Sequence, residues 1–223
     1  MGGTQSSKLY FAVEEQQGVT SNSHDEALKK TPPVSGVYDL CTKGGTTPIN
    51  SANCYIINAP GKYSLHLWYG NSMKDGKMNE SAYTSKASGQ KVLKNFVDHN
   101  DQEIRHPAIY YMKGIKDALL IWQDEPGLVT NVKLQDDDVL LFEVPQATIK
   151  QGNAIVAVRD LAGDIVWSWH IWVTDYVPGL EPTVEEHYDA TKTQRDKTVT
   201  NANGVSYTVM GLNLGWCYGD IIK

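Results

Sequence analysis

Apolar and polar residues alternate along residues 165–174 (IVWSWHIWVT) and predict a long β-strand, because successive side chains of a strand point to opposite faces. On this pattern Trp167, Trp169 and Ile171 face the protein core. Trp172 falls on the opposite face and is expected to point outward. Half of the six tryptophans of the chain therefore lie on one strand. The alternation of side chains predicts that Trp167 and Trp169 pack in the core and that Trp172 lies at the surface.

Further short apolar runs, separated by turn-forming residues, predict more strands. They cover residues 8–13, 54–58, 62–68, 118–123, 128–134, 139–144, 154–159 and 205–210. Strands at this spacing with short polar connections are typical of a sandwich, and no helical pattern separates the densest group as it would in a parallel α/β sheet. The predicted fold is all-β, an antiparallel immunoglobulin-like β-sandwich with Leu140 and Phe142 among its core residues.

A turn signal at Ala59-Pro60-Gly61 separates two of these strands, since proline fixes φ and glycine permits a positive φ. It predicts that residues 54–58 and 62–68 form a hairpin. Residues 71–117 form a long polar insertion in which residues 90–99 (QKVLKNFVDH) predict one short helix.

Proline-containing and polar segments divide the chain into three predicted regions. Residues 1–36 contain one short strand and a polar linker that ends near the prolines of Thr31-Pro32-Pro33. Residues 37–176 form the β-sandwich domain, and residues 177–223 form a linker and the start of a C-terminal module. We expect the chain to be a fragment, because this last module ends almost as soon as it begins.

The charge of the chain argues against a nucleic-acid partner. The net charge is −6 and the pI is near 5.5, whereas a protein that binds phosphate backbones needs a basic face. No apolar run is long enough for a transmembrane segment.

The reactive side chains form no recognisable motif. Cys41, Cys54 and Cys217 include no C-x-x-C pair, and a disulfide between the first two is left open. His66 and His170 fall on outward strand positions without a third ligand, so no metal site is predicted. Nucleophile-elbow, P-loop and dinucleotide-binding motifs are missing, and we expect no enzymatic activity and no cofactor.

Three tryptophans outside the predicted core suggest a second type of function. Trp68, Trp122 and Trp172 are expected on outward strand faces, and a Tyr-rich insertion accompanies them. Exposed aromatic rings can stack against sugar rings, so these residues are the candidate ligand-binding surface. The competing interpretation is that they contribute to packing.

Several ordered segments resemble the fimbrillin-like surface proteins of Bacteroides and relatives. The resemblance covers most of residues 23–217 and rests on SHDEAL (23–28), YDL (38–40), ANCYIINAPG (52–61), VLK (92–94), WQD (122–124), GNAIVAV (152–158) and WSWHIWVTD (167–175). Residues 207–215 (YTVMGLNLG) resemble the opening of a module that follows such a sandwich.

The resemblance implies a secreted, lipid-anchored or pilus-associated protein made of β-sandwich domains and involved in cell adhesion or fimbrial assembly. It implies a location at the cell surface or outer membrane of a Gram-negative bacterium, although no signal peptide or lipoprotein cysteine is visible at the polar start MGGTQSS. The resemblance implies no catalytic residues in this chain. Expected partners are other surface or pilus subunits that bind by strand addition, and glycans.

Three hypotheses follow. The first is a non-enzymatic cell-surface structural or adhesion module, acting as a spacer or fimbria-like accessory protein. The second is a carbohydrate-binding module of a surface glycan-binding protein. The third is a hydrolase of unknown type, since the chain has many isolated carboxylates that could form a catalytic pair.

Overall fold

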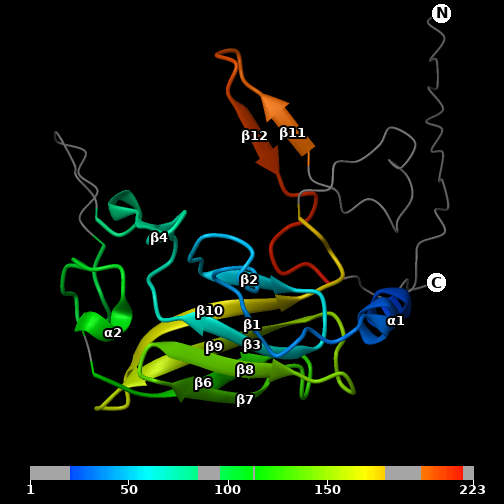
Figure 1. Ribbon diagram of the computed structural model, residues 1–223, viewed down its shortest axis with the longest axis horizontal. Coiled ribbons are helices and arrows are strands. Elements are labelled where there is room, and N and C mark those ends of the chain that lie inside the picture. The colour runs from blue at the N-terminus through cyan, green and yellow to red at the C-terminus, as the bar shows by residue number, and fades with distance from the viewer. Residues whose placement is uncertain (1–20, 85–95, 113, 179–196, 218–223) are drawn as a thin grey trace, which may run out of the picture.

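Two four-stranded β-sheets dominate the computed structural model, which describes residues 21–84, 96–112, 114–178 and 197–217 (Figure 1). The predicted all-β fold is confirmed. Apolar side chains from both sheets form one core, so the arrangement is sandwich-like. The immunoglobulin-like topology stays a prediction.

Each sheet has one short parallel edge pair and is otherwise antiparallel. Sheet A has the order β1 (Val37–Asp39), β3 (Gly61–His66), β8 (Val139–Val144) and β7 (Thr130–Gln135), with β1 parallel to β3. Sheet B has the order β2 (Cys54–Ile57), β10 (Ile165–Val173), β9 (Gly152–Asp160) and β6 (Ile115–Gln123), with β2 parallel to β10. Both sheets are therefore mixed rather than purely antiparallel.

The remaining elements are short. They are α1 (Ser21–Lys30), β4 (Met73–Lys74), β5 (Lys77–Met78), η1 (Glu80–Ala82), α2 (Ile109–Met112), β11 (Lys197–Thr200) and β12 (Ser206–Val209). The hairpin β11–β12 projects away from both sheets (Figure 1). None of the described helices is long and apolar enough to cross a membrane.

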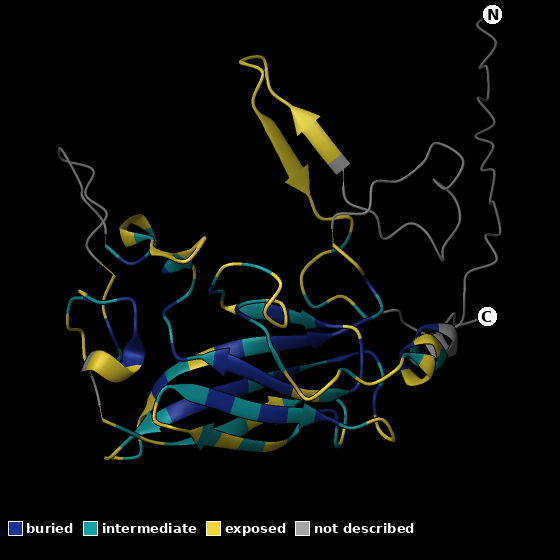
Figure 2. Ribbon diagram, viewed as in Figure 1, coloured by how far each residue is buried: buried dark blue, intermediate teal, exposed yellow. Residues whose placement is uncertain are grey.

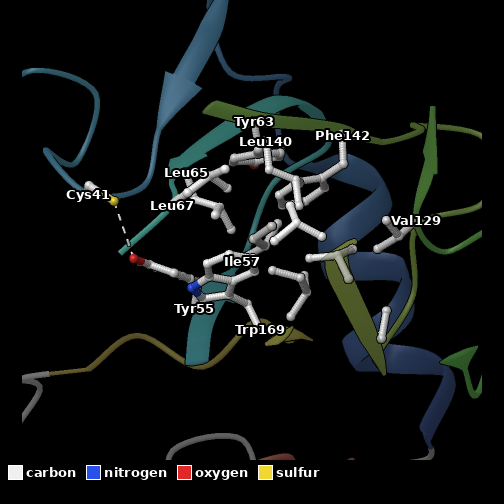
Figure 3. Close-up of a cluster of buried hydrophobic side chains, with 14 of the residues drawn as sticks. Cys41, Tyr55, Ile57, Tyr63, Leu65, Leu67, Val129, Leu140, Phe142 and Trp169 are labelled. Carbon is white, nitrogen blue, oxygen red and sulfur yellow. Dashed lines mark hydrogen bonds between the residues drawn. The ribbon is translucent and has the colours of Figure 1, made fainter. Parts of the chain in front are cut away.

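The core lies between the inner faces of the sheets, as the burial pattern in Figure 2 shows. Leu140 and Phe142 of β8 face it from sheet A, and Trp169 and Ile171 of β10 face it from sheet B. Figure 3 shows that Trp169 reaches the same cluster as Phe142 and Leu140. These side chains are at most 2% exposed, and the regular alternation along β8 comes from burial on one face.

Trp167 departs from the predicted core position. The register of β10 against β9 shifts between Ile165 and Trp167, and Val166 takes the buried position instead. Trp167 is half-buried at the margin of the core, where its indole Nε1 donates a hydrogen bond to Asn53 Oδ1 (3.1 Å). Its ring meets Tyr69 edge to face at 4.9 Å.

The predicted hairpin between residues 54–58 and 62–68 is wrong. Both strands exist, but β2 lies in sheet B and β3 lies in sheet A. The Pro60-Gly61 turn is a corner that carries the chain from one sheet to the other. The hydroxyl of Tyr63 donates a hydrogen bond to the Ala59 carbonyl (2.5 Å), and Gly61 has a φ of +145° beside the side chain of Val34.

A helix replaces part of the predicted N-terminal linker. In α1 the side chain of Leu28 is fully buried, and His24 Nδ1 lies 2.8 Å from Asp175 Oδ2, just beyond the end of β10. The backbone N–H of Gln151 donates a hydrogen bond to Asp25 Oδ1 (2.8 Å). The helix therefore packs against one end of the sandwich.

Two predicted elements lie wholly or partly outside the described residues. The strand predicted at residues 8–13 lies outside the described residues, and so do residues 90–95 of the predicted helix. At residues 96–99 the chain is not helical. Phe96 and Val97 are about half exposed, and Val97 forms an isolated bridge with Glu103.

Candidate functional site at the open margin of the sandwich

The two long margins of the sandwich differ. At one margin β6 and β7 lie against each other, and the buried residues Leu128 and Val129 close the space between the sheets. At the other margin the edge strands β1 and β2 leave a hollow of about 470 Å³. This hollow, here called the margin groove, is lined mainly by Val34, Tyr38, Leu40, Tyr55, Ile57, Tyr63 and Val177.

The margin groove has an apolar floor contributed by both sheets. Tyr63 of sheet A meets Tyr38 edge to face at 5.9 Å, and it stacks on Phe142 in the core at 5.7 Å. From sheet B, Tyr55 and Ile57 are at most 7% exposed. Large rings anchored in the core give the groove a fixed shape.

A hydrogen-bonded pair holds Tyr55 in place. Its hydroxyl lies 3.2 Å from the sulfur of Cys41 and accepts a hydrogen bond from the Ala52 N–H (3.1 Å) (Figure 3). Burial raises the pKa of the Tyr55 phenol and the pKa of the Cys41 thiol, so both stay neutral at ordinary pH. All three cysteines are free, and the bridge left open between Cys41 and Cys54 is not formed.

The backbone of β2 presents an unpaired edge beside the groove. His170 N–H donates to Asn53 O (2.8 Å) and Thr174 N–H donates to Ile57 O (2.9 Å), so the odd-numbered residues of β2 face β10. Alternate residues of a strand direct their backbone groups to opposite sides. Cys54 and Ile56 therefore direct their N–H and C=O groups away from the sheet, where no described strand pairs with them.

The three tryptophans of the predicted ligand surface have three different environments. Trp68 is partly buried against the core and stacks on His66 at a centroid distance of 4.6 Å. Trp122 lies on β6 and is 52% exposed. Trp172 is fully buried, so they do not form one exposed aromatic surface, and glycan binding stays a prediction.

The prediction that Trp172 is exposed is wrong because later residues cover it. Its place in the strand alternation puts its side chain on the outer face, but its indole Nε1 donates a hydrogen bond to the Trp216 carbonyl (2.9 Å). Its ring also stacks on Tyr176 at 5.6 Å. Residues 213–217, here called the covering segment, thus lie over the outer face of sheet B. The alternation of residues within one strand cannot predict a contact with a segment so far along the chain.

Sequence reasoning also missed the margin groove. β1 has only three residues, too few for a periodic pattern, so Tyr38 gave no strand signal. The Pro60-Gly61 corner was visible, but a turn of this kind fits a hairpin or a change of sheet equally well. Among the described residues, no three His, Cys, Asp or Glu side chains gather in a way that could hold a metal ion.

Comparisons of the chain with protein-family models, with curated proteins and with solved structures find no match. Functional interpretation therefore rests on the geometry of the margin groove and of the outer face of sheet B.

Proposed function

We propose that the chain is a structural or adhesive β-sandwich module of a fimbria-like cell-surface protein, and that its margin groove accepts an extended strand from a neighbouring surface subunit. The observation that carries this proposal is the unpaired edge of β2 beside an apolar groove between the two sheets. A strand added there would find backbone partners and side-chain sites together.

The groove suits an extended peptide with alternating side chains. The N–H and C=O groups of Cys54 and Ile56 would pair with the backbone of the added strand, in the mode known as β-augmentation. Every second side chain of that strand would point between the sheets toward Tyr38 and Tyr55. Each new backbone hydrogen bond contributes about 0.5–1.5 kcal/mol, so the apolar contacts would supply most of the affinity.

The resemblance of the chain to fimbrillin-like proteins supports the choice of partner. Proteins of that family are associated with pili and surfaces, and strand addition between subunits is a direct way to join sandwich domains. The module would belong at the outer surface of a Gram-negative cell, beside other subunits of the same assembly.

Proline substitution in β2 tests the groove. Ile56→Pro removes an N–H that faces the open side, and proline is tolerated where the N–H of an edge strand is unpaired. We expect the folded variant to lose self-association or co-assembly with surface subunits, measured by light scattering and by cross-linking on intact cells. Unchanged assembly by folded Ile56→Pro would overturn the strand-addition proposal.

A matched control lies at the opposite edge of the same sheet. Ile121 is at an irregularity of β6, where the register with β9 shifts between Leu120 and Trp122. Ile121→Pro is expected to leave assembly intact. Protease treatment of intact cells tests the location separately, since a module at the surface is cleaved while the cells stay closed.

A further inference from the structure

A chain of hydrogen bonds crosses the outer face of sheet B and ends at a cysteine. Cys54 Sγ lies 3.2 Å from His170 Nδ1, and His170 Nε2 lies 2.8 Å from Asn153 Oδ1. These residues come from β2, β10 and β9, which are adjacent in the sheet, and His170 is the direct register partner of Cys54. Pairing of distant strands brings together three residues that the sequence keeps apart.

Asp124 fixes the direction of this chain. The backbone N–H of Asn153 donates to Asp124 Oδ1 (2.7 Å), and the side-chain Nδ2 donates to Asp124 Oδ2 (3.0 Å) and to Gly215 O (3.1 Å). Carboxylate and carbonyl oxygens only accept, so the amide nitrogen faces them and Oδ1 faces His170. His170 Nε2 then carries the proton, and the lone pair of Nδ1 faces the thiol of Cys54.

The resting pair is neutral. Burial raises the pKa of the Cys54 thiol to about 11. Burial also lowers the pKa of His170, against an opposing effect from the charge of Asp124. The pair is therefore a thiol beside a neutral imidazole, the state in which the imidazole can take the thiol proton as the sulfur attacks.

Space for a substrate lies beside the pair. A shallow hollow of about 470 Å³ is lined by His170 together with Asn53, Ile155, Trp167 and Ser168, and Cys54 itself lines the adjoining margin groove. The N–H of Cys54 points to the open edge of β2 and can donate to the oxygen of a carbonyl that the sulfur attacks. A nucleophile, a base, an orienting amide and a backbone donor are the parts that thiol-dependent acyl transfer needs, and this set recurs on unrelated folds.

We propose that Cys54 and His170 form an acyl-transfer site that accepts carboxylic esters with a small apolar acyl group. The sulfur of Cys54 bonds to the acyl carbon as the ester C–O bond breaks. The thiol proton passes to His170 Nδ1 and then to the departing oxygen. Water then adds to the thioester, releasing the acid and restoring the thiol.

The roles of the four residues differ. Cys54 and His170 touch the reacting atoms and are the catalytic residues, whereas Asn153 and Asp124 are positioning residues. This activity departs from the sequence-based expectation of a non-enzymatic protein, because no motif links residues 54, 124, 153 and 170. It does not require strand addition but would compete with it, because an added strand would pair with the same N–H of Cys54. Ile56→Pro tests strand addition without changing the four side chains.

Acetylation by p-nitrophenyl acetate tests the site on the full chain. We expect a stoichiometric burst of p-nitrophenolate and one acetyl group on Cys54, found by intact-mass and peptide analysis and released by hydroxylamine. Cys54→Ala should remove the burst, and His170→Gln should slow it by about a hundredfold or more, the range for loss of a general base. Cys41→Ala and Cys217→Ala serve as matched thiol controls and should retain it.

The pH dependence separates a catalytic pair from an ordinary buried thiol. The ionisable groups around His170 are Cys54 on β2, Asp124 beyond β6 and Cys217 in the covering segment. With His170 as base, the burst rate stays level through neutral pH and falls only below the lowered pKa of His170. Asp124→Asn should lower that inflection, because the charge of Asp124 raises the pKa of His170, and a merely structural role would not produce this shift.

Two results would overturn the proposal. One is a burst rate that rises about tenfold per pH unit toward pH 11, as thiolate formation at an isolated Cys54 requires. The other is acetylation of Cys54 that is no faster than that of Cys217, or that is unchanged in folded His170→Gln. Circular dichroism of each variant shows that the comparison is made between folded proteins.

Discussion

At the scale of single residues, the outer face of sheet B shows how one contact changes the role of a side chain. Trp172 has the parity of a surface residue, yet it is fully buried under the covering segment. Gly215 allows this close approach, since it has a φ of +80° and lies directly against Asn153 and His170. Because Gly215 has no side chain, its backbone can come close enough for its carbonyl to accept a hydrogen bond from the side-chain amide of Asn153.

Gly215→Ala should therefore detach the covering segment. A Cβ there would lie 2.9 Å from Asn153 Oδ1 and 3.3 Å from His170 Cε1, with a backbone conformation that alanine disfavours. We expect a red shift of tryptophan emission and stronger acrylamide quenching as Trp172 becomes exposed. Gly204→Ala is the matched control, because Gly204 has a similar φ of +76° but open space around it. Equal spectra for both variants would contradict the assigned role of Gly215.

At the scale of elements, periodicity predicts strands well where one face is buried. Residues 139–144 match β8 because Leu140, Phe142 and Val144 all face the core. The pairing of strands could not be predicted in the same way, since β2 joins β10 across more than a hundred residues and nothing in residues 54–57 indicates that partner. For the same reason, the meeting of Cys54 with His170 was not visible in the sequence.

The helix α1 was missed because its apolar signal is a single position. Leu28 is the fully buried apolar residue of α1, while Ala27 and Lys29 beside it are exposed. Polar contacts complete the docking, and these link α1 to residues more than a hundred positions away at Gln151 and Asp175. Such contacts leave no pattern within a ten-residue segment.

Leu28→Ala should loosen α1 while the two sheets stay folded. Truncating a fully buried leucine costs about 2–5 kcal/mol, which exceeds what a short helix with few apolar contacts can spare. We expect faster hydrogen exchange in residues 21–30 with little change in β8 or β10, measured by mass spectrometry. Lys29→Ala, at an exposed position of the same helix, should leave exchange unchanged. Equal protection in both variants would mean that α1 does not depend on Leu28.

At the scale of the whole molecule, two sheets share one core and each keeps one edge strand at the open margin. The interior is closed at the β6–β7 margin and stays accessible between β1 and β2. A module of this kind can present its edge to a partner without disturbing the packing of Trp169 and Phe142. Strand addition and acyl transfer would then meet at Cys54, because both use its N–H at the open edge of β2.

If the core is shared, a cavity on one side must weaken both sheets together. Trp169 is 1% exposed and meets apolar side chains of both sheets, so Trp169→Ala should lower the free energy of unfolding by about 3–5 kcal/mol. Hydrogen exchange should then accelerate equally in β8 of sheet A and β9 of sheet B. Trp122→Ala removes the same ring from a site that is 52% exposed and should cost less than about 1 kcal/mol. Protection lost in sheet B alone would show instead that the two sheets unfold as separate units, and a strand bound at the margin groove could then stabilise one sheet without the other.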